Sequence, residues 1–290
     1  MMKKIVILGS SGFLGRNLCG FFSDNCNFEL FPLSRKDVDF TNFDSLKQRV
    51  LDISPDYIIH SAVSLENFEN NIRMFYALEN LACYVKKIII IGSGAEYIAN
   101  RYKPLMKESY FPSEAVFPKD IYSLSKFTIS KLHASSSVEN IYNLRVFGIY
   151  GPHEDFQRRL ISNNIVRHIN NMPLTYNRNV TFDYLYINDF LSSIENFLAL
   201  EKPLFNTYNL CIGKGYEFKE IMNTIADVVG FDHSKIILKD PTPSNYVYSG
   251  DSSLLENEIG KIEKTSLFEA INSLYKWYID QDINKLKLHK

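Results

Sequence analysis

A glycine-rich turn between an apolar strand and a helix constrains the fold of this chain more than any other feature. Residues 4–8 form a short, β-branched apolar run that stops at Gly9, as expected of a parallel strand buried on both faces. The following turn leads into residues 16–22, whose apolar positions have helical spacing. Glycine allows a sharp turn and a close backbone approach to phosphates, and a helix N-terminus offers amide donors. This order predicts a dinucleotide-binding turn with contacts at Gly9, Ser11, Gly12, Phe13, Leu14 and Gly15.

Apolar runs and helical patterns alternate through most of the chain. We expect strands at 28–33, 57–60, 87–91, 141–147 and 208–211, and helices at 42–50, about 66–83, from the region of Tyr122 to about Ser137, near 160–171, near 189–200 and at 266–278. A loop rich in proline and acids covers 98–119, and Gly148 to Pro152 close the fifth strand. Such alternation predicts an α/β fold: a Rossmann-type, doubly wound parallel sheet with right-handed crossovers.

The pattern loosens after Gly151, which predicts a second, smaller unit. We expect residues 1–150 and 181–211 to form a NAD(P)-binding domain. Residues 151–180 and 212–290 would then form a mixed α/β substrate domain that covers the carboxyl edge of the sheet. Ligands of open α/β sheets bind at that edge.

Composition excludes several classes of partner. The 290 residues are 46% hydrophobic and 22% charged, with a net charge of -1. No long run of like charge is present, so we expect neither nucleic acid nor a membrane surface as a partner. The apolar run after Lys3 and Lys4 is too short for a signal peptide, and no segment has the length of a membrane span. We therefore expect a cytoplasmic protein.

The four cysteines are scattered, with no CxxC pair and no histidine at metal-ligand spacing; they are Cys19, Cys26, Cys83 and Cys211. This distribution predicts free, mostly buried thiols in a reducing compartment and no metal site.

The end of the second strand bears on the choice of cofactor. Ser34 and Arg35 follow this strand directly. An acidic residue here binds the ribose 2′-hydroxyl of NAD, whereas an arginine suits the 2′-phosphate of NADP. Arg35 favours NADPH, and Asp37 and Asp39 lie close enough in sequence to leave NADH possible.

Further cofactor contacts are expected at two strand ends. Asp39-Phe40 can contact the edge of the adenine, or can form an ordinary surface turn. His60-Ser61-Ala62 ends the third strand at the edge where cofactors lie. We interpret His60 as a packed or backbone-bonded residue in preference to an acid–base catalyst.

A tyrosine and a lysine four residues apart lie within Asp-Ile-Tyr-Ser-Leu-Ser-Lys-Phe, residues 120–127. On a helix, Tyr122 and Lys126 share one face, and a nearby ammonium lowers the pKa of a phenol toward the range of acid–base catalysis. Among 18 tyrosines such a pair arises by chance, so only its surroundings give it meaning. Ser93 follows the fourth strand and reaches the same edge as the glycine turn.

Together these segments resemble the extended short-chain dehydrogenase/reductases, the NAD-dependent epimerase/dehydratase group that acts on nucleotide sugars. The resemblance covers nearly the whole chain. It rests on the glycine turn, on Ser93 four residues before Tyr97, on Tyr122-x-x-x-Lys126, and on three further strings: Leu144-Arg-Val-Phe-Gly-Ile-Tyr-Gly-Pro152, Phe182-Asp-Tyr-Leu-Tyr-Ile-Asn-Asp189 and Tyr208-Asn-Leu-Cys-Ile-Gly213.

The resemblance implies a role for each matched position. Tyr122 would exchange a proton with the sugar oxygen, Lys126 would hold the nicotinamide ribose, and Ser93 would hydrogen-bond the reacting oxygen. Further cofactor contacts are implied at Asn71, Phe147 and Ile149. Substrate contacts are implied at Ser93, Gly94, Ala95, Gly148, His153, Arg159, Asn163 and Tyr184.

Departures from the family pattern narrow the expected reaction. The 4,6-dehydratases place an Asp-Glu pair where this chain has Gly94 and Ala95, so dehydration is not expected. Ser34-Arg35 and residues 151–156 resemble the GDP-fucose-synthase-like branch, but its epimerising Cys and His align with Ala95 and Arg159, which cannot exchange the required protons. Gly148 replaces the usual asparagine, which suggests an unusual sugar or a shifted pose.

These features predict NADPH-dependent reduction of the C4 ketone of a nucleotide-linked 4-keto-6-deoxy sugar, in the synthesis of unusual sugars for surface polysaccharide. The partner is a nucleotide-diphosphate sugar, and a homodimer through the helix that bears Tyr122 is expected. One alternative is a nucleotide-sugar 4-epimerase with tightly bound NAD. A second is a non-catalytic NAD(P)-binding scaffold or redox sensor.

Overall fold

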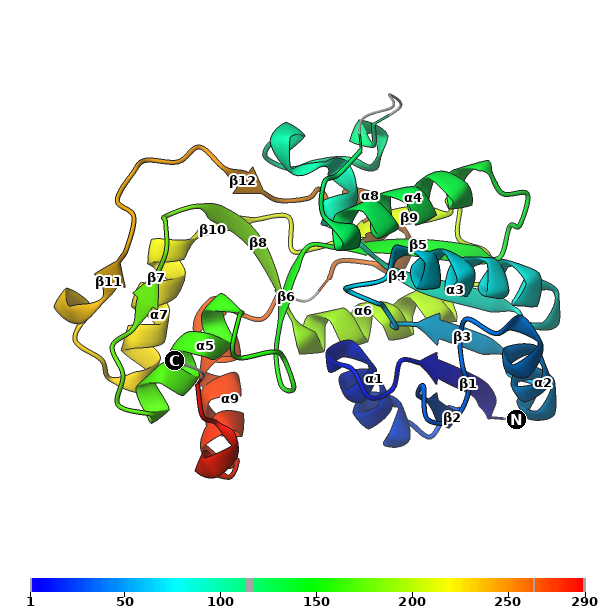
Figure 1. Ribbon diagram of the computed structural model, residues 1–290, viewed down its shortest axis with the longest axis horizontal. Coiled ribbons are helices and arrows are strands. Elements are labelled where there is room, and N and C mark those ends of the chain that lie inside the picture. Colours follow the sequence, from blue (N-terminus) through cyan, green and yellow to red (C-terminus); the bar gives the residue numbers. More distant parts are fainter. Residues whose placement is uncertain (1, 113–116, 263, 289–290) are drawn as a thin grey trace.

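A computed structural model describes residues 2–112, 117–262 and 264–288 (Figure 1). Along the chain its elements are β1 (Lys3–Leu8), α1 (Phe13–Ser23), β2 (Phe28–Leu33), α2 (Phe43–Ile53), β3 (Tyr57–His60), α3 (Phe68–Leu81), β4 (Lys87–Ser93), α4 (Ile121–Ser135), β5 (Ile141–Val146), β6 (Gly148–Tyr150), α5 (Leu160–Ile169), β7 (Thr175–Tyr176), β8 (Thr181–Tyr186), α6 (Ile187–Ala199), β9 (Thr207–Leu210), β10 (Gly215–Glu217), α7 (Phe218–Val229), β11 (Ile237–Leu238), β12 (Val247–Tyr248), α8 (Ser253–Ile259) and α9 (Leu267–Ile279). Short 3₁₀ helices lie between them, among them η2 (Gly94–Tyr97) and η4 (Glu108–Tyr110). Part of the loop expected at 98–119, residues 113–116, lies outside the described residues.

The central sheet has six strands in the order β2-β1-β3-β4-β5-β9, and every neighbouring pair is parallel. The strand order reverses at β1, which has β2 on one side and β3 on the other. This arrangement confirms the doubly wound parallel sheet predicted from the sequence. The reversal creates a crevice outside the carboxyl ends of β1 and β3, where ligands of such sheets bind.

Burial of both faces explains why the strands read as continuous apolar runs. Ile5 and Ile7 join a core cluster with residues of α1 and α6. Val6 and Leu8, which alternate with them, join a second cluster with residues of α2, α3 and α4. Because successive side chains point to opposite faces, a strand covered by helices on both sides has no polar positions.

A second sheet holds β10, β8 and β12, and β6 pairs with β8. The predicted division assigned the residues of β6 and β8 to the NAD(P)-binding domain. In the structure both strands lie in this second sheet. The chain leaves the first sheet at Phe147, and Gly148 then pairs with Tyr184. The two-domain division itself stays a prediction. Figure 1 shows α5, α7 and α9 gathered beside this second sheet, away from α1 to α4.

Two further expectations concern the surface. All four cysteines are free, but the expectation that they are mostly buried is wrong, because Cys26 and Cys83 are exposed. Within the described ranges, no helix combines the length and the apolar character needed to cross a membrane.

A buried lysine anchors one helix to the sheet. Lys87, at the start of β4, is 3% exposed. Its ammonium donates to the carbonyls of Phe197, at 3.1 Å, and Leu200, at 2.7 Å, at the C-terminal end of α6. Burial lowers the pKa of Lys87 to about 8. A cation at a helix C-terminus satisfies carbonyls that have no partner within the helix, so this contact fixes α6 against the sheet.

We expect Lys87→Met to lower the free energy of unfolding by about 1–3 kcal/mol, because the two carbonyls lose their donor. Urea unfolding of the purified variant measures this loss. Lys86→Met is the matched control: Lys86 pairs with Asp56 at 2.8 Å but its side chain is 70% exposed, so its removal should have little effect. Equal losses in the two variants would contradict the anchoring role.

Candidate active site

The glycine turn lets the carboxyl ends of β1 and β3 lie closer together than they could if its glycines carried side chains. Gly9 has a φ of 90°, and a Cβ there would lie 2.7 Å from the amide nitrogen of Ala62. A Cβ on Gly15 would lie 2.0 Å from the carbonyl oxygen of Gly9. Gly12 precedes α1, whose first turn has no side-chain cap. An uncapped helix N-terminus behind a bare backbone turn fits the diphosphate of a dinucleotide.

Other predicted cofactor residues lie at the ends of β3 and β2. The hydroxyl of Ser61 donates to the carbonyl of Leu8 at 2.9 Å, which links the ends of β3 and β1. Arg35 is exposed, and Asp37 accepts hydrogen bonds from the amide and hydroxyl of Ser34, both at 2.7 Å.

Four other predicted contact residues already pack or hydrogen-bond within the protein. Phe40 is buried in the core cluster beneath α2 and α3, and Asp39 accepts hydrogen bonds from Thr41. The amide of Asn71, in α3, bonds the backbone of Ser64 and donates to the hydroxyl of Ser125 in α4 at 3.0 Å. Asn71 thus connects the loop after β3 to the helix that bears Tyr122. Ile149 lies in β6, against the first core cluster.

His60 ends β3 as a buried, neutral imidazole. Burial, with a smaller effect of Lys126, lowers the pKa of His60 to about 3. Its Nδ1 has no hydrogen-bond partner within the described residues. A group that is neutral across the physiological range does not carry the acidic proton of an imidazolium, so these properties favour the packed role expected for His60.

Ser93, Tyr122 and Lys126 come together at the end of β4. Ser93 caps η2, and its hydroxyl accepts a hydrogen bond from the amide of Ala95 at 3.1 Å. Tyr122 lies in the first turn of α4, close enough to the Ser93 hydroxyl for that group to lower its pKa. Nζ of Lys126 lies 5.9 Å from the centre of the Tyr122 ring and donates to the carbonyl of Ile91 at 2.6 Å.

The direction of the pKa shift of Tyr122 differs from the direction expected from the sequence. Burial raises the pKa of Tyr122, and the Ser93 hydroxyl and the Arg159 guanidinium oppose that effect. A lowering of this pKa was expected from Lys126, but the net shift is upward, and burial lowers the pKa of Lys126 itself to about 8. The guanidinium of Arg159, immediately before α5, also favours the phenolate of Tyr122.

An aromatic wall from the C-terminal part of the chain closes one side of the Ser93 turn. The ring of Tyr248 lies 5.0 Å from that of Phe147 and 4.9 Å from that of Tyr102. A Cβ on Gly94 would lie only 2.5 Å from the Tyr248 hydroxyl and 2.7 Å from the Phe147 ring. The Ser93 hydroxyl also acts on the pKa of Tyr248. The phenols of Tyr122 and Tyr248 therefore both approach the Ser93 hydroxyl.

The remaining predicted substrate residues are spread over the second sheet and α5. A Cβ on Gly148 would lie 2.5 Å from the carbonyl oxygen of Asp183, which explains why this position holds glycine. Asn163 donates to the backbone of Phe156 at 2.9 Å, and the ring of Tyr184 packs on Phe182.

His153 has a φ of 68° and packs edge-on against Trp277. Its role as a substrate contact, like the other roles implied for single residues, stays a prediction.

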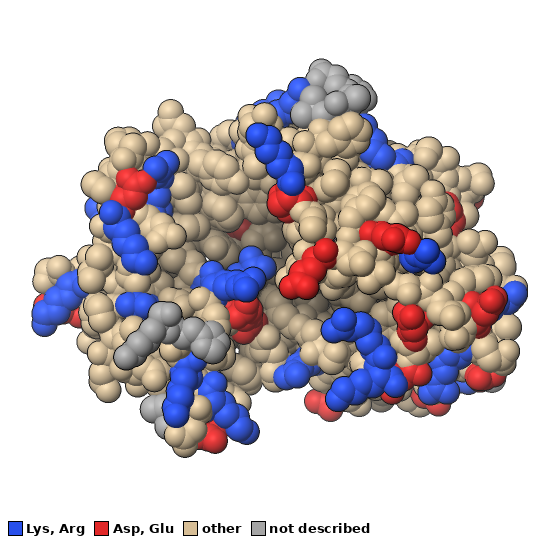
Figure 2. Space-filling model, viewed as in Figure 1, with Lys and Arg blue, Asp and Glu red and all other residues tan. Residues whose placement is uncertain are grey.

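Figure 2 shows that the face viewed is hollowed near its centre, between the parts built on the two sheets, with acidic and basic side chains at the rim. Such a hollow is where a ligand held by both parts would lie.

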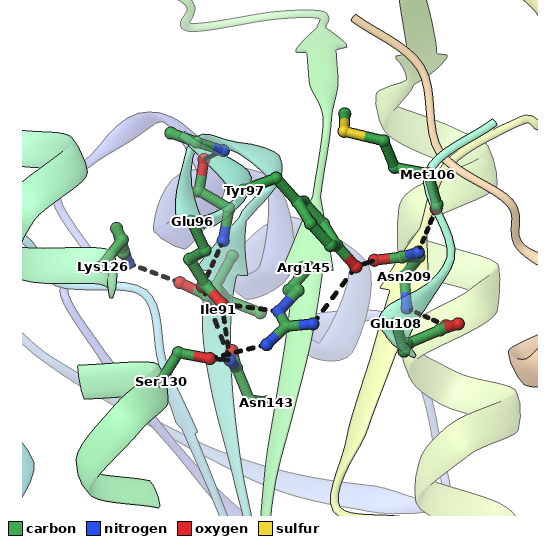
Figure 3. A network of polar contacts seen from close by, with 12 residues as sticks. Ile91, Glu96, Tyr97, Met106, Glu108, Lys126, Ser130, Asn143, Arg145 and Asn209 are labelled. Atoms are coloured by element: carbon green, nitrogen blue, oxygen red, sulfur yellow. Dashed lines mark hydrogen bonds and ion pairs between the residues drawn. The ribbon is translucent and has the colours of Figure 1, made fainter. Parts of the chain in front are cut away.

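Reading the sequence missed two groups at this site. Tyr248 gave no signal, because its approach to Ser93 depends on how a distant segment returns to the sheet. Glu96 gave one: Ser93-x-x-Glu96 is the pattern of a capping box, which the structure forms. Glu96 also bonds Arg145 in a buried network (Figure 3).

The chain is similar to proteins that are named as enzymes of nucleotide sugars. GDP-6-deoxy-D-talose 4-dehydrogenase of Aggregatibacter actinomycetemcomitans is 24% identical over 291 residues, covering 94% of this chain and 97% of that protein. The dTDP-4-dehydrorhamnose reductase of the same organism is 26% identical over 162 residues, covering 52% and 54%.

Solved structures share the fold. A dTDP-glucose 4,6-dehydratase from Bacillus anthracis, in complex with NAD, has a TM-score of 0.84 at 16% identity, covering 98% of this chain and 100% of that one. A UDP-glucose 4-epimerase from Thermotoga maritima, with UDP-glucose, has a TM-score of 0.81 at 19% identity, with the same coverage. The NAD dependent epimerase/dehydratase family matches residues 5–211, as the glycine turn and the Tyr-x-x-x-Lys pair indicated, and this chain belongs to that family.

Proposed function

We propose that this protein reduces the C4 ketone of a nucleotide-linked 4-keto-6-deoxy sugar, with NADPH as the hydride donor. The observation that carries the proposal is the arrangement of Ser93, Tyr122 and Lys126 at the carboxyl edge of the parallel sheet, beside the glycine turn. A bound nicotinamide would supply the hydride. The chain itself supplies binding, orientation and the proton.

Each of the three side chains has a task in this reaction. The raised pKa of Tyr122 keeps its phenol protonated at neutral pH, so it can donate a proton to the oxygen formed from the ketone. Ser93, beside that phenol, would hydrogen-bond the same oxygen and polarise the carbonyl. The buried amine of Lys126 donates to the carbonyl of Ile91 and would hold the ribose of the cofactor.

Elimination of water is less well supported. A dehydratase needs an acid and a base directly after Ser93, but the space around Gly94 is occupied by Tyr248 and Phe147, and Ala95 carries only a methyl group. Epimerisation beside the ketone needs groups that exchange protons with carbon, and Ala95 and Arg159 do not provide them. Ketone reduction requires neither.

The two curated relatives support chemistry at the sugar C4. One is named as a reductase of a 4-dehydro sugar and the other as a 4-dehydrogenase, which is the reverse direction of the same hydride transfer. The solved structures of similar fold include epimerases and dehydratases, so a 4-epimerase that retains NAD remains the second candidate.

Two features of the proposal concern binding. Asp37 is held by Ser34, and Arg35 is exposed at the end of β2, where it can meet a 2′-phosphate; this favours NADPH over NADH. The exposed side chains of Tyr76 on α3 and Ile121 on α4 favour a homodimer through these helices.

The first test follows NADPH absorbance with GDP-linked and dTDP-linked 4-keto-6-deoxy sugars, with NADH in parallel reactions. We expect rapid oxidation of NADPH with one nucleotide and a slower reaction with NADH. Conversion of a nucleotide sugar without net oxidation, by protein that retains NAD from purification, would favour the 4-epimerase. No reaction of either kind would contradict both proposals.

The second test removes the proton donor. Tyr122→Phe should lower turnover by at least about 100-fold, the usual contribution of a general acid, while NADPH binding followed by fluorescence changes little. Tyr84→Phe, an exposed tyrosine of the 3₁₀ helix after α3, is the matched control and should turn over at the wild-type rate. Unchanged turnover in Tyr122→Phe would remove Tyr122 from the mechanism.

A further inference from the structure

Glu96 holds the backbone of the Ser93 turn from inside the protein. It is the third residue of η2, and its Oε1 accepts a hydrogen bond from the amide of Ser93 at 2.9 Å. The side chain of Ser93 in turn caps the start of η2. Because Ser93 is also the last residue of β4, this contact fixes where the strand ends and where its hydroxyl points.

A buried arginine fixes Glu96. Nε of Arg145 donates to the Glu96 carboxylate at 2.6 Å, and both side chains are almost fully buried. Arg145 also donates to the Ser130 hydroxyl, on α4, at 2.7 Å and to the Tyr97 hydroxyl at 3.1 Å. Figure 3 shows these residues lying between β4, β5 and α4, with Lys126 on the same helix as Ser130. The network therefore ties the Ser93 turn to the helix that bears Tyr122.

The backbone makes room for this network. A Cβ on Gly92 would lie 2.6 Å from Oε1 of Glu96 and 2.1 Å from Oδ1 of Asn143. Gly92 is paired with Arg145 across the two strands. A buried ion pair rarely adds stability over an apolar pair of similar volume, because both charges lose their hydration. Its presence directly behind Ser93 needs a reason other than stability.

We propose that Glu96 is a positioning residue of this active site, which is held by Arg145, fixes the Ser93 turn through the Ser93 amide and keeps a negative charge behind Lys126 and Tyr122. The proposal rests on the proposed function in taking Ser93, Tyr122 and Lys126 as the reacting group. No contact between Glu96 and the substrate is required.

The charges around Lys126 give this proposal a measurable consequence. Glu96 faces Lys126 from η2, His60 faces it from β3, and Tyr122 lies on its own helix. His60 is neutral, so Glu96 is the anion that opposes the effect of burial on Lys126. Removal of this negative charge destabilises the ammonium, so the pKa of Lys126 must fall further below its present value of about 8.

The test is a pH titration of Lys126 in the full chain with Glu96→Gln. Lysine labelled with an NMR-active carbon isotope at Cε reports each amine, and the signal missing from Lys126→Met identifies Lys126. We expect the midpoint in Glu96→Gln to lie below the wild-type midpoint by about one pH unit. Where NADPH oxidation is measurable, its alkaline limb should move in the same direction. An unchanged midpoint in folded protein would overturn the proposal.

Tyr97→Phe is the matched control, because it removes a bond to the same Arg145 without a change of charge or of the Ser93 contact. We expect a lower melting temperature and an unchanged Lys126 midpoint. An equal shift in Tyr97→Phe would reduce Glu96 to a general structural role and overturn the proposal.

If Glu96→Gln does not fold by itself, we combine it with Arg145→Met. The second substitution removes the arginine charge that has lost its partner. This pair keeps an acceptor for the Ser93 amide, and a smaller downward shift is expected, because the loss of the Arg145 charge opposes the loss of the Glu96 charge. The titration needs no sugar substrate, so it decides the role of Glu96 even if no 4-keto sugar is reduced.

Discussion

The parallel pairing of six strands, buried on both faces, is the constraint on which the rest of the structure depends. It forces every strand of that sheet to end at one edge, and it places the turn after β1, the end of β3 and the Ser93 turn after β4 next to one another. The close contact of Gly9 with Ala62 and Gly15 then fixes the separation of the first two. The glycine turn and the Ser93 turn thus lie at the same edge because of strand direction.

The same burial sets the chemistry of the site. Desolvation favours the neutral form of each titratable group, so Tyr122 keeps its proton, Lys126 binds its proton less tightly and His60 is uncharged. These effects are opposed by charges from other elements: Arg159 acts on Tyr122, and Glu96 acts on Lys126. The proposed reacting group is therefore influenced by burial and by charges that lie outside the Tyr-x-x-x-Lys motif.

Much of the fold could be predicted because its signals are local. The strands at Phe28–Leu33 and Tyr57–His60 have the bounds expected from apolar runs that are broken by polar residues. β6 has only three residues and no such run, so its pairing with β8 could not be read from the sequence. The place of Tyr248 beside Ser93 depends on how a segment 155 residues further along the chain returns to the sheet. The raised pKa of Tyr122 depends on burial that only packing determines.

The most direct test of the central claim uses NADPH that carries deuterium at the transferable position of the nicotinamide, with a nucleotide-linked 4-keto-6-deoxy sugar as substrate. Mass spectrometry and NMR of the product then locate the label. The proposed reaction requires deuterium at the sugar C4, with one molecule of NADP formed for each molecule of product. Product without deuterium, or conversion without net formation of NADP, would contradict reduction at C4.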